Sequence, residues 1–550
     1  MFIRSIKNIF RFSATKSLFI IFLIIINTLL EVLSIGTIIP LISLFLNSEI
    51  YEINFILNFT LTFNKVLLLF IIFIIFKNLT LIYYSYCINN LVAQYKSYLS
   101  ISIFKKINSQ DYLFFSKNKT SDLFQSINDD PLIYTQQGIK SSLMLLADII
   151  VSVFIVLILF FINFKISLSI FGSISLIFLL SYLFFKKYST NLGNIRRKTN
   201  IQLINFINKT LNSIKEIKVY GSINFFNNKL EKNTIDNSNS LATFAWIQSL
   251  PKSIFEIFII ILVILNVYIM KQNSSIEELI NYVGVFIFIS LRLAPNINRS
   301  FTYIQSMKFA KSFEEKIINN MKLKTISFNN INNSKYELSS DIILKNINLT
   351  IDEKKILENF NFVFKKHSFN GIFGPSGSGK SKLIEIIIGL IKPNSGKIFF
   401  GKKVYENVSE NIFSKVGYCA HTSPMINDTI ENNILFGRAK IKNHETVINK
   451  LFDISGLNSL ISSFPEGKNY ILNELENNLS SGQKQRIAIC RALYYEHDLI
   501  IFDESTNALD EESELKILNN IKKNFNQTTF IIISHSKRVM DYCSNICKLK

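Results

Sequence analysis

The sequence is poor in the residues that cross-link small domains or hold metal ions. It has five cysteines, five histidines and one tryptophan among 550 residues. No cysteine stands at a zinc-ligand spacing with histidines nearby, which argues against a structural zinc site. Because the cysteines are expected to face a reducing cytosol, we predict no disulfide. Cys543 and Cys547, four positions apart, are expected to share one face of a helix.

Acidic residues are also scarce relative to basic ones. The chain has 60 Lys and Arg against 40 Asp and Glu, which gives a net charge of +20. Such a charge would suit a nucleic-acid binder, but the basic residues stand beside long apolar runs. In that position they orient a membrane protein and meet anionic lipid. We therefore expect membrane lipid as a partner and no nucleic acid.

Long apolar runs dominate the first 300 residues, and the mean hydropathy of +0.27 is high for a soluble protein. About 20 apolar residues cross a bilayer, and the first run is too long for a cleaved signal peptide. We predict six such spans, and an even number of spans places both termini on the same side of the membrane. The long basic stretches lie on that side as well, and the positive-inside rule assigns it to the cytoplasm. The predicted spans cover about Leu18–Leu46, Val66–Tyr86, Leu143–Ile162, Ile166–Phe185, Ser253–Met270 and Leu279–Leu293.

Three ionisable residues stand out in or beside the spans: Glu31, Arg292 and Arg299. A charge inside a bilayer is costly and usually faces a cavity or a partner. Because Arg292 and Arg299 are seven positions apart, they share one helix face, and we interpret them as a cationic stripe lining a substrate cavity. The alternative is a structural role, with an arginine paired to Glu31 or with Arg299 at the cytoplasmic interface.

The composition changes after the spans. Residues 322–340 are rich in Asn, Lys and Ser, and we interpret them as a linker. From residue 341, short β-like runs alternate with helical ones, which is typical of an α/β domain. The sequence therefore predicts a six-helix membrane domain over residues 1–321, fused to an α/β domain over residues 341–550.

A glycine-rich stretch in the second domain fits the phosphate-binding loop G-x-x-x-x-G-K-[ST]. Its glycines allow backbone N–H groups to converge on phosphate oxygens, and the N-terminus of the following helix adds partial positive charge. Lys380 is predicted to reach the β- and γ-phosphates, and Ser381 to bind Mg²⁺. We expect a strand over 371–373 and a helix over 383–390. The loop consists of Gly374, Pro375, Ser376, Gly377, Ser378, Gly379, Lys380 and Ser381.

Two carboxylates end a second apolar strand about 120 residues further on. Asp503 is placed to hold Mg²⁺, and Glu504 is the candidate general base that polarises the attacking water. A strand ending in two acids is common, but with the phosphate loop it indicates a nucleoside triphosphatase.

The stretch Leu479-Ser480-Ser481-Gly482-Gln483 resembles the signature of ATP-binding cassette (ABC) proteins. Asp510 is similar to the family's D-loop aspartate, and His535 to its switch histidine. With spans ahead of the cassette, the chain resembles an exporter-type half transporter. This implies ATP and Mg²⁺ as cofactors and a dimer in which the signature closes on the other subunit's nucleotide. It also implies a protein of the bacterial inner membrane whose cassette lies in the cytoplasm.

Residues 291–299, together with Glu31 and Pro40, look like the lipid-linked oligosaccharide flippases of bacterial protein N-glycosylation. That resemblance implies an amphipathic, phosphate-bearing substrate, which arginine would bind in a bidentate fork. Peptide, drug or other lipid cargo remains an alternative.

Four sites depart from the ABC pattern. The adenine-stacking aromatic ring is expected near Thr350 or Ile351, and neither is aromatic. Lys382 replaces Ser or Thr, His421 replaces the Q-loop glutamine, and Ser481 replaces glycine. We expect slow but real hydrolysis by a homodimer. The alternative is a degenerate subunit that binds ATP and pairs with a different, active half transporter.

Overall fold

The computed structural model describes the chain apart from residues 38–50, 54–58, 62, 163, 271–294, 326–339, 352, 406–414, 473–478, 496, 507–508 and 550. The chain divides into two units. Unit 1 comprises Met1–Gln110 and Lys117–Lys324, and unit 2 comprises Asp111–Ser116 and Thr325–Lys550. Most of the predicted linker lies outside the described residues, so the domain limits stay predictions.

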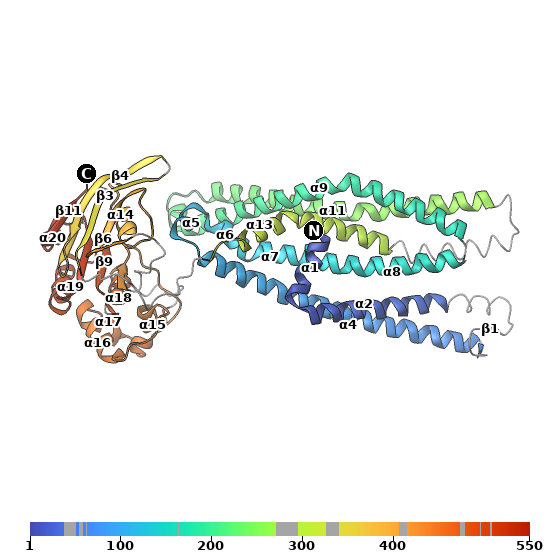
Figure 1. The fold of residues 1–550 in the computed structure, drawn as a ribbon, viewed down its shortest axis with the longest axis horizontal. Coiled ribbons are helices and arrows are strands. Elements are labelled where there is room, and N and C mark those ends of the chain that lie inside the picture. Colours follow the sequence, from blue (N-terminus) through green and yellow to red (C-terminus); the bar gives the residue numbers. More distant parts are fainter. Residues whose placement is uncertain are drawn as a thin grey trace. The chain divides into compact units, whose positions relative to one another are not determined.

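Unit 1 is built from helices far longer than a bilayer is thick. α4, α9 and α11 have 46, 49 and 48 residues, or about 70 Å of helix each, against about 30 Å of hydrocarbon core. α2 packs along α4, and α9 along α11 (Figure 1). The elements are α1 (Phe2–Phe12), α2 (Ala14–Gly36), β1 (Tyr51–Ile53), β2 (Phe59–Leu61), α4 (Phe63–Asn108), α6 (Thr120–Ile127), α7 (Asp129–Ile133), the π-helix η1 (Tyr134–Lys140), α8 (Ser141–Ile162), α9 (Phe164–Asn212), α10 (Ile214–Val219), α11 (Ile223–Met270) and α13 (Lys311–Met321).

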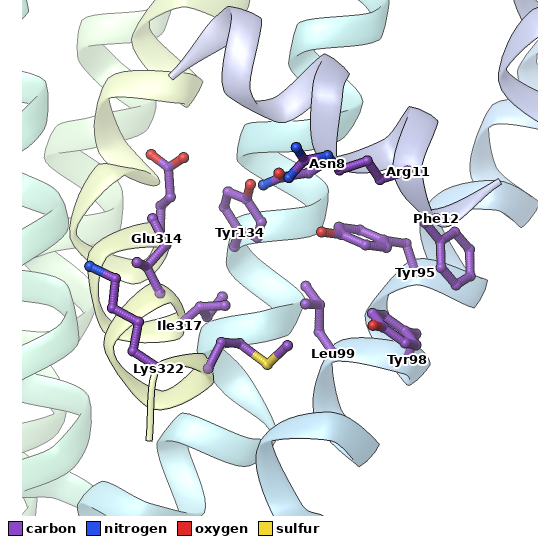
Figure 2. Close-up of a pocket in the computed structure, with 12 residues that line it drawn as sticks. Asn8, Arg11, Phe12, Tyr95, Tyr98, Leu99, Tyr134, Glu314, Ile317 and Lys322 are labelled. Carbon is purple, nitrogen blue, oxygen red and sulfur yellow. The ribbon is translucent and has the colours of Figure 1, made fainter. Parts of the chain in front are cut away.

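Within the described residues, three helical stretches are long and apolar enough to cross a membrane: Ala14–Ser34, Phe63–Asn108 and Thr120–Leu157. α8 ends at Ile162 and α9 begins at Phe164, close to the limits predicted for the third span at Ile162 and the fourth at Ile166. The sixth predicted span, residues 279–293, lies outside the described residues. A pocket of about 380 Å³ lies among α1, α4, η1 and α13 (Figure 2).

The described strands of unit 2 form two sheets. One is parallel, in the order β11-β5-β10-β9-β8, and the other is antiparallel, in the order β4-β3-β6-β7. The strands are β3 (Ile342–Ile351), β4 (Lys354–Phe364), β5 (Phe369–Phe373), β6 (Ser395–Phe400), β7 (Lys403–Tyr405), β8 (Val416–Cys419), β9 (Leu499–Asp503), β10 (Thr529–Ile533) and β11 (Asn545–Lys548). The helices are α5 (Tyr112–Lys117, which ends one residue into unit 1), α14 (Lys380–Ile387), α15 (Ile430–Leu435), α16 (His444–Ser455), α17 (Asn458–Ser463), η3 (Gly467–Asn469), α18 (Ser481–Leu493), α19 (Glu511–Asn524) and α20 (Lys537–Asp541).

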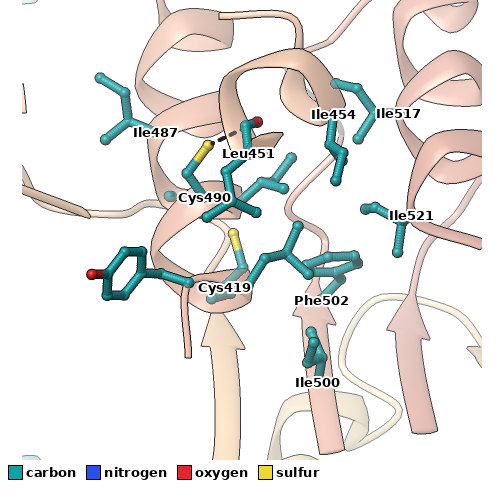
Figure 3. Close-up of a cluster of buried hydrophobic side chains, with 14 of the residues drawn as sticks. Cys419, Leu451, Ile454, Ile487, Cys490, Ile500, Phe502, Ile517 and Ile521 are labelled. Atoms are coloured by element: carbon teal, nitrogen blue, oxygen red, sulfur yellow. Dashed lines mark hydrogen bonds between the residues drawn. The ribbon is translucent and has the colours of Figure 1, made fainter. Parts of the chain in front are cut away.

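Buried side chains fill both faces of the parallel sheet. In β9, Ile500 and Phe502 join one apolar cluster, shown in Figure 3, while Leu499 and Ile501 join the other. This split follows from the two-residue period of a strand. The alternation explains why such a strand reads as a continuous apolar run in the sequence.

All five cysteines are free. The prediction that Cys543 and Cys547 share a helix face is wrong. Cys543 follows the short helix α20, whereas Cys547 lies in β11, which pairs with β5. Because the chain changes from helix to strand between them, the four-residue spacing carries no helical meaning here.

Candidate nucleotide-binding site

The glycine-rich loop connects β5 to α14, as predicted. Gly377 and Gly379 have φ angles of +84° and +89°, which side chains with a Cβ rarely adopt. A Cβ on Gly379 would also lie 2.9 Å from Ile356 Cγ2. The helix spans Lys380–Ile387, so the prediction of 383–390 was late at both ends. Gly389, with φ +78°, ends it in a left-handed conformation.

Lys380 crosses the inside of this loop. Its side chain is buried, and Nζ donates to the carbonyl oxygens of Gly374 and Pro375, at 2.9 Å each. An ammonium has three donors and no acceptor, so it would exchange these carbonyls for the stronger charge of phosphate oxygens. The loop therefore forms a preorganised cradle for an anion.

Asp503 ends β9 beside the loop. The hydroxyl of Tyr418, on β8, donates to Asp503 Oδ2 at 3.0 Å. Burial raises the pKa of Asp503, and the bond from Tyr418 opposes this rise. Tyr418 was missed in the sequence because a tyrosine at a strand end carries no motif. The carboxylate of Asp503 and the hydroxyl of Ser381 are hard oxygen ligands of the kind Mg²⁺ prefers, so the residues present fit this ion.

Glu504 and His535 meet although 31 positions separate them. Glu504 has a φ of +49°, and its amide donates to the carbonyl of Ile533 at 3.1 Å. Glu504 Oε1 lies 3.1 Å from His535 Nε2, and Lys380 Nζ lies 3.4 Å from the same nitrogen. One ring nitrogen cannot donate to the carboxylate and accept from the ammonium at once. The histidine can therefore exchange one partner for the other.

His421 belongs to the same group of residues. Its Nδ1 lies 3.4 Å from the carbonyl oxygen of Glu504. The neighbouring strands explain the convergence, since Ile533 of β10 pairs with Asp503 of β9 and with Ile372 of β5. The carboxyl ends of these parallel strands therefore share one edge, where α/β sheets commonly bind ligands.

Two family models match the chain. The model described as ABC transporter transmembrane region matches residues 17–293, and the model described as ABC transporter matches residues 357–507. The chain belongs to the ABC transporter family. Its ATP-binding domain couples ATP hydrolysis to transport across a membrane.

Similar proteins include several exporters. The chain is 26% identical to an export ATP-binding/permease protein of Rickettsia bellii, over 96% of this chain and 91% of that one. It is 29% identical to the multidrug resistance-like ATP-binding protein MdlA of Buchnera aphidicola, over 80% and 76%. It is 33% identical to the mitochondrial iron-sulfur clusters transporter ATM1 of Candida glabrata, over 40% and 30%.

The fold is also that of an exporter. A bacterial Atm1-family ABC exporter, solved with ATP bound, superposes with a TM-score of 0.81 at 15% identity, covering 98% of this chain and 93% of that one. The ABC transporter described here therefore has an exporter-type transmembrane domain fused to an ATPase cassette, as predicted. Its specific likeness to oligosaccharide flippases remains an interpretation of the sequence.

The signature begins a helix. Ser480 caps α18: its Oγ accepts from the amide of Gln483 at 3.2 Å, and its own amide donates to Gln483 Oε1 at 2.8 Å. This reciprocal box explains the Ser-x-x-Gln spacing. Asp510 similarly caps α19, accepting from the amide of Ser513 at 2.9 Å. Leu479 is buried, whereas Ser481 is exposed. Their roles at a second subunit's nucleotide stay predictions.

The departures have structural counterparts. Ile351 ends β3, where it pairs with Lys354 and packs against the apolar cluster. Lys382 Nζ lies 2.6 Å from Glu385 Oε2 and 6.0 Å from the ring centroid of Tyr112. Ile351 thus keeps an apolar surface but offers no aromatic ring. Lys382 contacts a part of the chain that the sequence did not connect with the phosphate loop.

The charged residues of the membrane domain pair in an unforeseen way. Glu31 Oε2 lies 2.5 Å from Lys77 Nζ, and Arg299 contacts Asp148 through two bonds of 3.3 Å each. Arg299 therefore pairs with Asp148, and not with Glu31 as one of the alternatives supposed. Arg292 lies outside the described residues. Lys77 and Asp148 stand inside predicted spans, so a complete list of ionisable residues in the spans would have found both.

Proposed function

We propose that this transporter is an ATP-driven exporter or flippase of the bacterial inner membrane. Its proposed cargo is an amphipathic, phosphate-bearing molecule, for which lipid-linked oligosaccharide is the specific candidate. The observation that supports ATP hydrolysis as the energy source is the convergence of Lys380, Glu504 and His535 in a chain with the exporter fold.

In the proposed mechanism, the glycine-rich loop and Lys380 hold the β- and γ-phosphates of ATP. Glu504 orients and deprotonates the attacking water, and His535 shifts its contact from Glu504 to the γ-phosphate. Ser381 and Asp503 would hold Mg²⁺, which neutralises phosphate charge. The remaining proposed nucleotide contacts are Pro375, Ser376, Ser378, Lys382 and His421.

A second subunit completes this site in our proposal. The signature, Leu479–Gln483, would cover the nucleotide held by the partner's loop, with Asp510 beside it. Support comes from the tip formed by α10 and Tyr220, where Val219 and Tyr220 are 73% and 79% exposed in the single chain. Exposed apolar side chains grouped on one surface are typical of protein interfaces. A homodimer would give each tip a surface to bury it.

The proposed cargo site uses Arg299, together with Glu31 and with Arg292, which the sequence predicts on the same helix face as Arg299. Asp148 takes hydrogen bonds from Nε and Nη2 of Arg299, and Asn296 takes another from Nη2. A guanidinium has five N–H donors, so these contacts leave Nη1 for a phosphate oxygen. An anionic substrate would compete with Asp148 for the same charge.

Reconstitution tests the cargo. Full-length protein in liposomes is given a fluorescent lipid-linked oligosaccharide, and exposure of its sugar on the other leaflet is measured with ATP. We expect ATP-dependent exposure that Arg299→Gln abolishes in a folded protein. Transport of a peptide or drug instead of the glycan would contradict the glycan proposal. That alternative is favoured by the similarity to the multidrug resistance-like protein of Buchnera.

The second candidate function is a weakly hydrolysing half transporter that works only beside a different, active one. The observations that favour it are the missing ring at Ile351 and the exposed Ser481. ATPase turnover of the purified chain decides between the two. Under the homodimer proposal, Glu504→Gln lowers turnover about 100-fold or more, whereas Glu512→Gln, an exposed carboxylate on α19, leaves it unchanged. Turnover that survives Glu504→Gln would contradict the assigned base.

A further inference from the structure

The residues that line the pocket among α1, α4, η1 and α13 belong neither to the nucleotide site nor to the charged pairs of the spans. α1 ends at Phe12, and the first apolar span begins at Ala14. α1 carries Arg4, Lys7 and Arg11, while Ser5 and Ile9 are buried on its other side. A basic amphipathic helix that leads into a span lies at the level of the lipid head groups. This pocket therefore lies where a head group can reach it.

Aromatic rings form one wall of the pocket. The ring centroid of Phe12 lies 5.2 Å from those of both Tyr95 and Tyr98. Tyr134, which is almost fully buried, lies opposite, and the hydroxyl of Tyr95 points into the space between them (Figure 2). Aromatic faces attract organic cations, so this wall favours a ligand that carries an ammonium group.

The charges that line the pocket have both signs. Arg11 and Lys322 are exposed at its edges. Glu314 is only 4% exposed, and among the described residues its Oε1 has no hydrogen-bond partner. Burial raises the pKa of Glu314, while the amino group of Met1 and Arg4 act in the opposite direction. A buried carboxylate oxygen without a donor is costly, so a ligand that donates a hydrogen bond to this oxygen would be stabilised in the pocket.

We propose that this pocket binds the head group of an aminophospholipid of the phosphatidylethanolamine type. The primary ammonium would donate to Glu314 and lie against the tyrosine rings, while Arg11 and Lys322 would hold the phosphate. The volume, about 380 Å³, falls within the range of about 300–1,000 Å³ for ligand pockets. The acyl chains would continue into the bilayer beside the first span. This site would bind a resident lipid and is independent of the cargo.

Native mass spectrometry of the detergent-solubilised full-length protein tests this proposal. Phosphatidylethanolamine, phosphatidylcholine and phosphatidylglycerol with identical acyl chains compete for binding after endogenous lipid is removed. Because a trimethylammonium group cannot donate a hydrogen bond, we expect at least about fivefold more phosphatidylethanolamine than phosphatidylcholine to be retained. Phosphatidylglycerol, which lacks an ammonium, should also be retained less.

Two variants separate the charges, and thermal unfolding checks that each is folded. Glu314→Gln should bring the ratio of phosphatidylethanolamine to phosphatidylcholine close to one, whereas Glu315→Gln, its exposed neighbour on α13, should leave it unchanged. Arg11→Gln, at an exposed position, should lower retention of both lipids about equally, since both carry a phosphate. It keeps the proposal testable even if Glu314→Gln does not fold.

Three results would overturn the proposal. One is equal retention of the two zwitterionic lipids by the wild-type protein. Another is a ratio that Glu314→Gln does not change, or that Glu315→Gln lowers as much. The last is displacement of the lipid by an equal concentration of glycerophosphoethanolamine, which lacks acyl chains and would identify a soluble ligand instead.

Discussion

Two hairpin tips of the chain differ in how their apolar side chains are covered. The first tip, Asp111–Ser116, belongs to the same compact unit as the cassette, and Leu113 packs against the apolar cluster there. At the second tip, formed by α10 and Tyr220, only Ile217 is buried, while Val219 and Tyr220 are exposed. Both tips carry the aliphatic and aromatic residues that interfaces use.

The difference shows which docking contacts of the transporter can form within one chain. The first tip has its docking surface within the same chain, so its contacts do not depend on protein concentration. The second tip has the composition of a docking element but is exposed in the single chain. We infer that a second subunit covers the second tip, in line with the dimer proposed above.

The largest expected effect is at the second tip. The double variant Val219→Asp/Tyr220→Asp should lower substrate-stimulated ATPase and transport by at least about tenfold. The reason is that burial of each such side chain contributes about 1.5–3 kcal/mol, and 1.4 kcal/mol is a factor of ten. Transport assays in liposomes and sedimentation of the purified protein measure this. Ser213→Asp, at the polar start of α10, is the matched control. Full transport by the double variant would refute the interface.

A smaller effect is expected at the first tip. Leu113→Ala removes a partly buried side chain and should lower the stability of the contact with the cassette by about 1–2 kcal/mol. Transport should fall severalfold, independently of protein concentration, because this contact lies within one chain. Phe115→Ala, at an exposed position of the same helix, is the control. A loss that grows on dilution would instead assign this tip to the subunit interface.

The smallest effect is expected at Lys382. Lys382→Ser removes the ion pair with Glu385 and the contact with the ring of Tyr112, together worth about 0.5–1 kcal/mol. We expect ATPase turnover to change less than about threefold. In a double-mutant cycle, Tyr112→Ala should couple to Lys382→Ser, whereas Tyr112→Phe, which keeps the ring, should not. Additive effects of Tyr112→Ala and Lys382→Ser would show that the contact is not functional.

The phosphate-loop half of the site could be predicted because its requirements are local. Gly377 and Gly379 need a conformation that only glycine adopts readily, and Ser480 caps a helix through a residue three positions away. Such constraints leave a fixed spacing in the sequence. The end of α14 at Gly389 was misjudged because an apolar run does not reveal which glycine stops a helix.

Contacts between distant segments could not be predicted in the same way. The pairing of Arg299 with Asp148 and of Glu31 with Lys77 depends on how the helices pack. The same holds for Tyr418 at Asp503 and Tyr112 near Lys382. Each of these side chains is ordinary in its own sequence context, and only its neighbour in space gives it a role.

Membrane spans followed by an ATP-binding cassette could be predicted from local patterns of apolar residues and glycines. The folded chain was needed to see which charges meet in the membrane domain, which of the two tips is covered within one chain, and where a buried carboxylate lies beside aromatic rings. These features bring together segments that are far apart in the chain, as Tyr95 and Glu314, about 220 positions apart, are in the pocket. Their proximity comes from helix packing, which leaves no spacing along the chain.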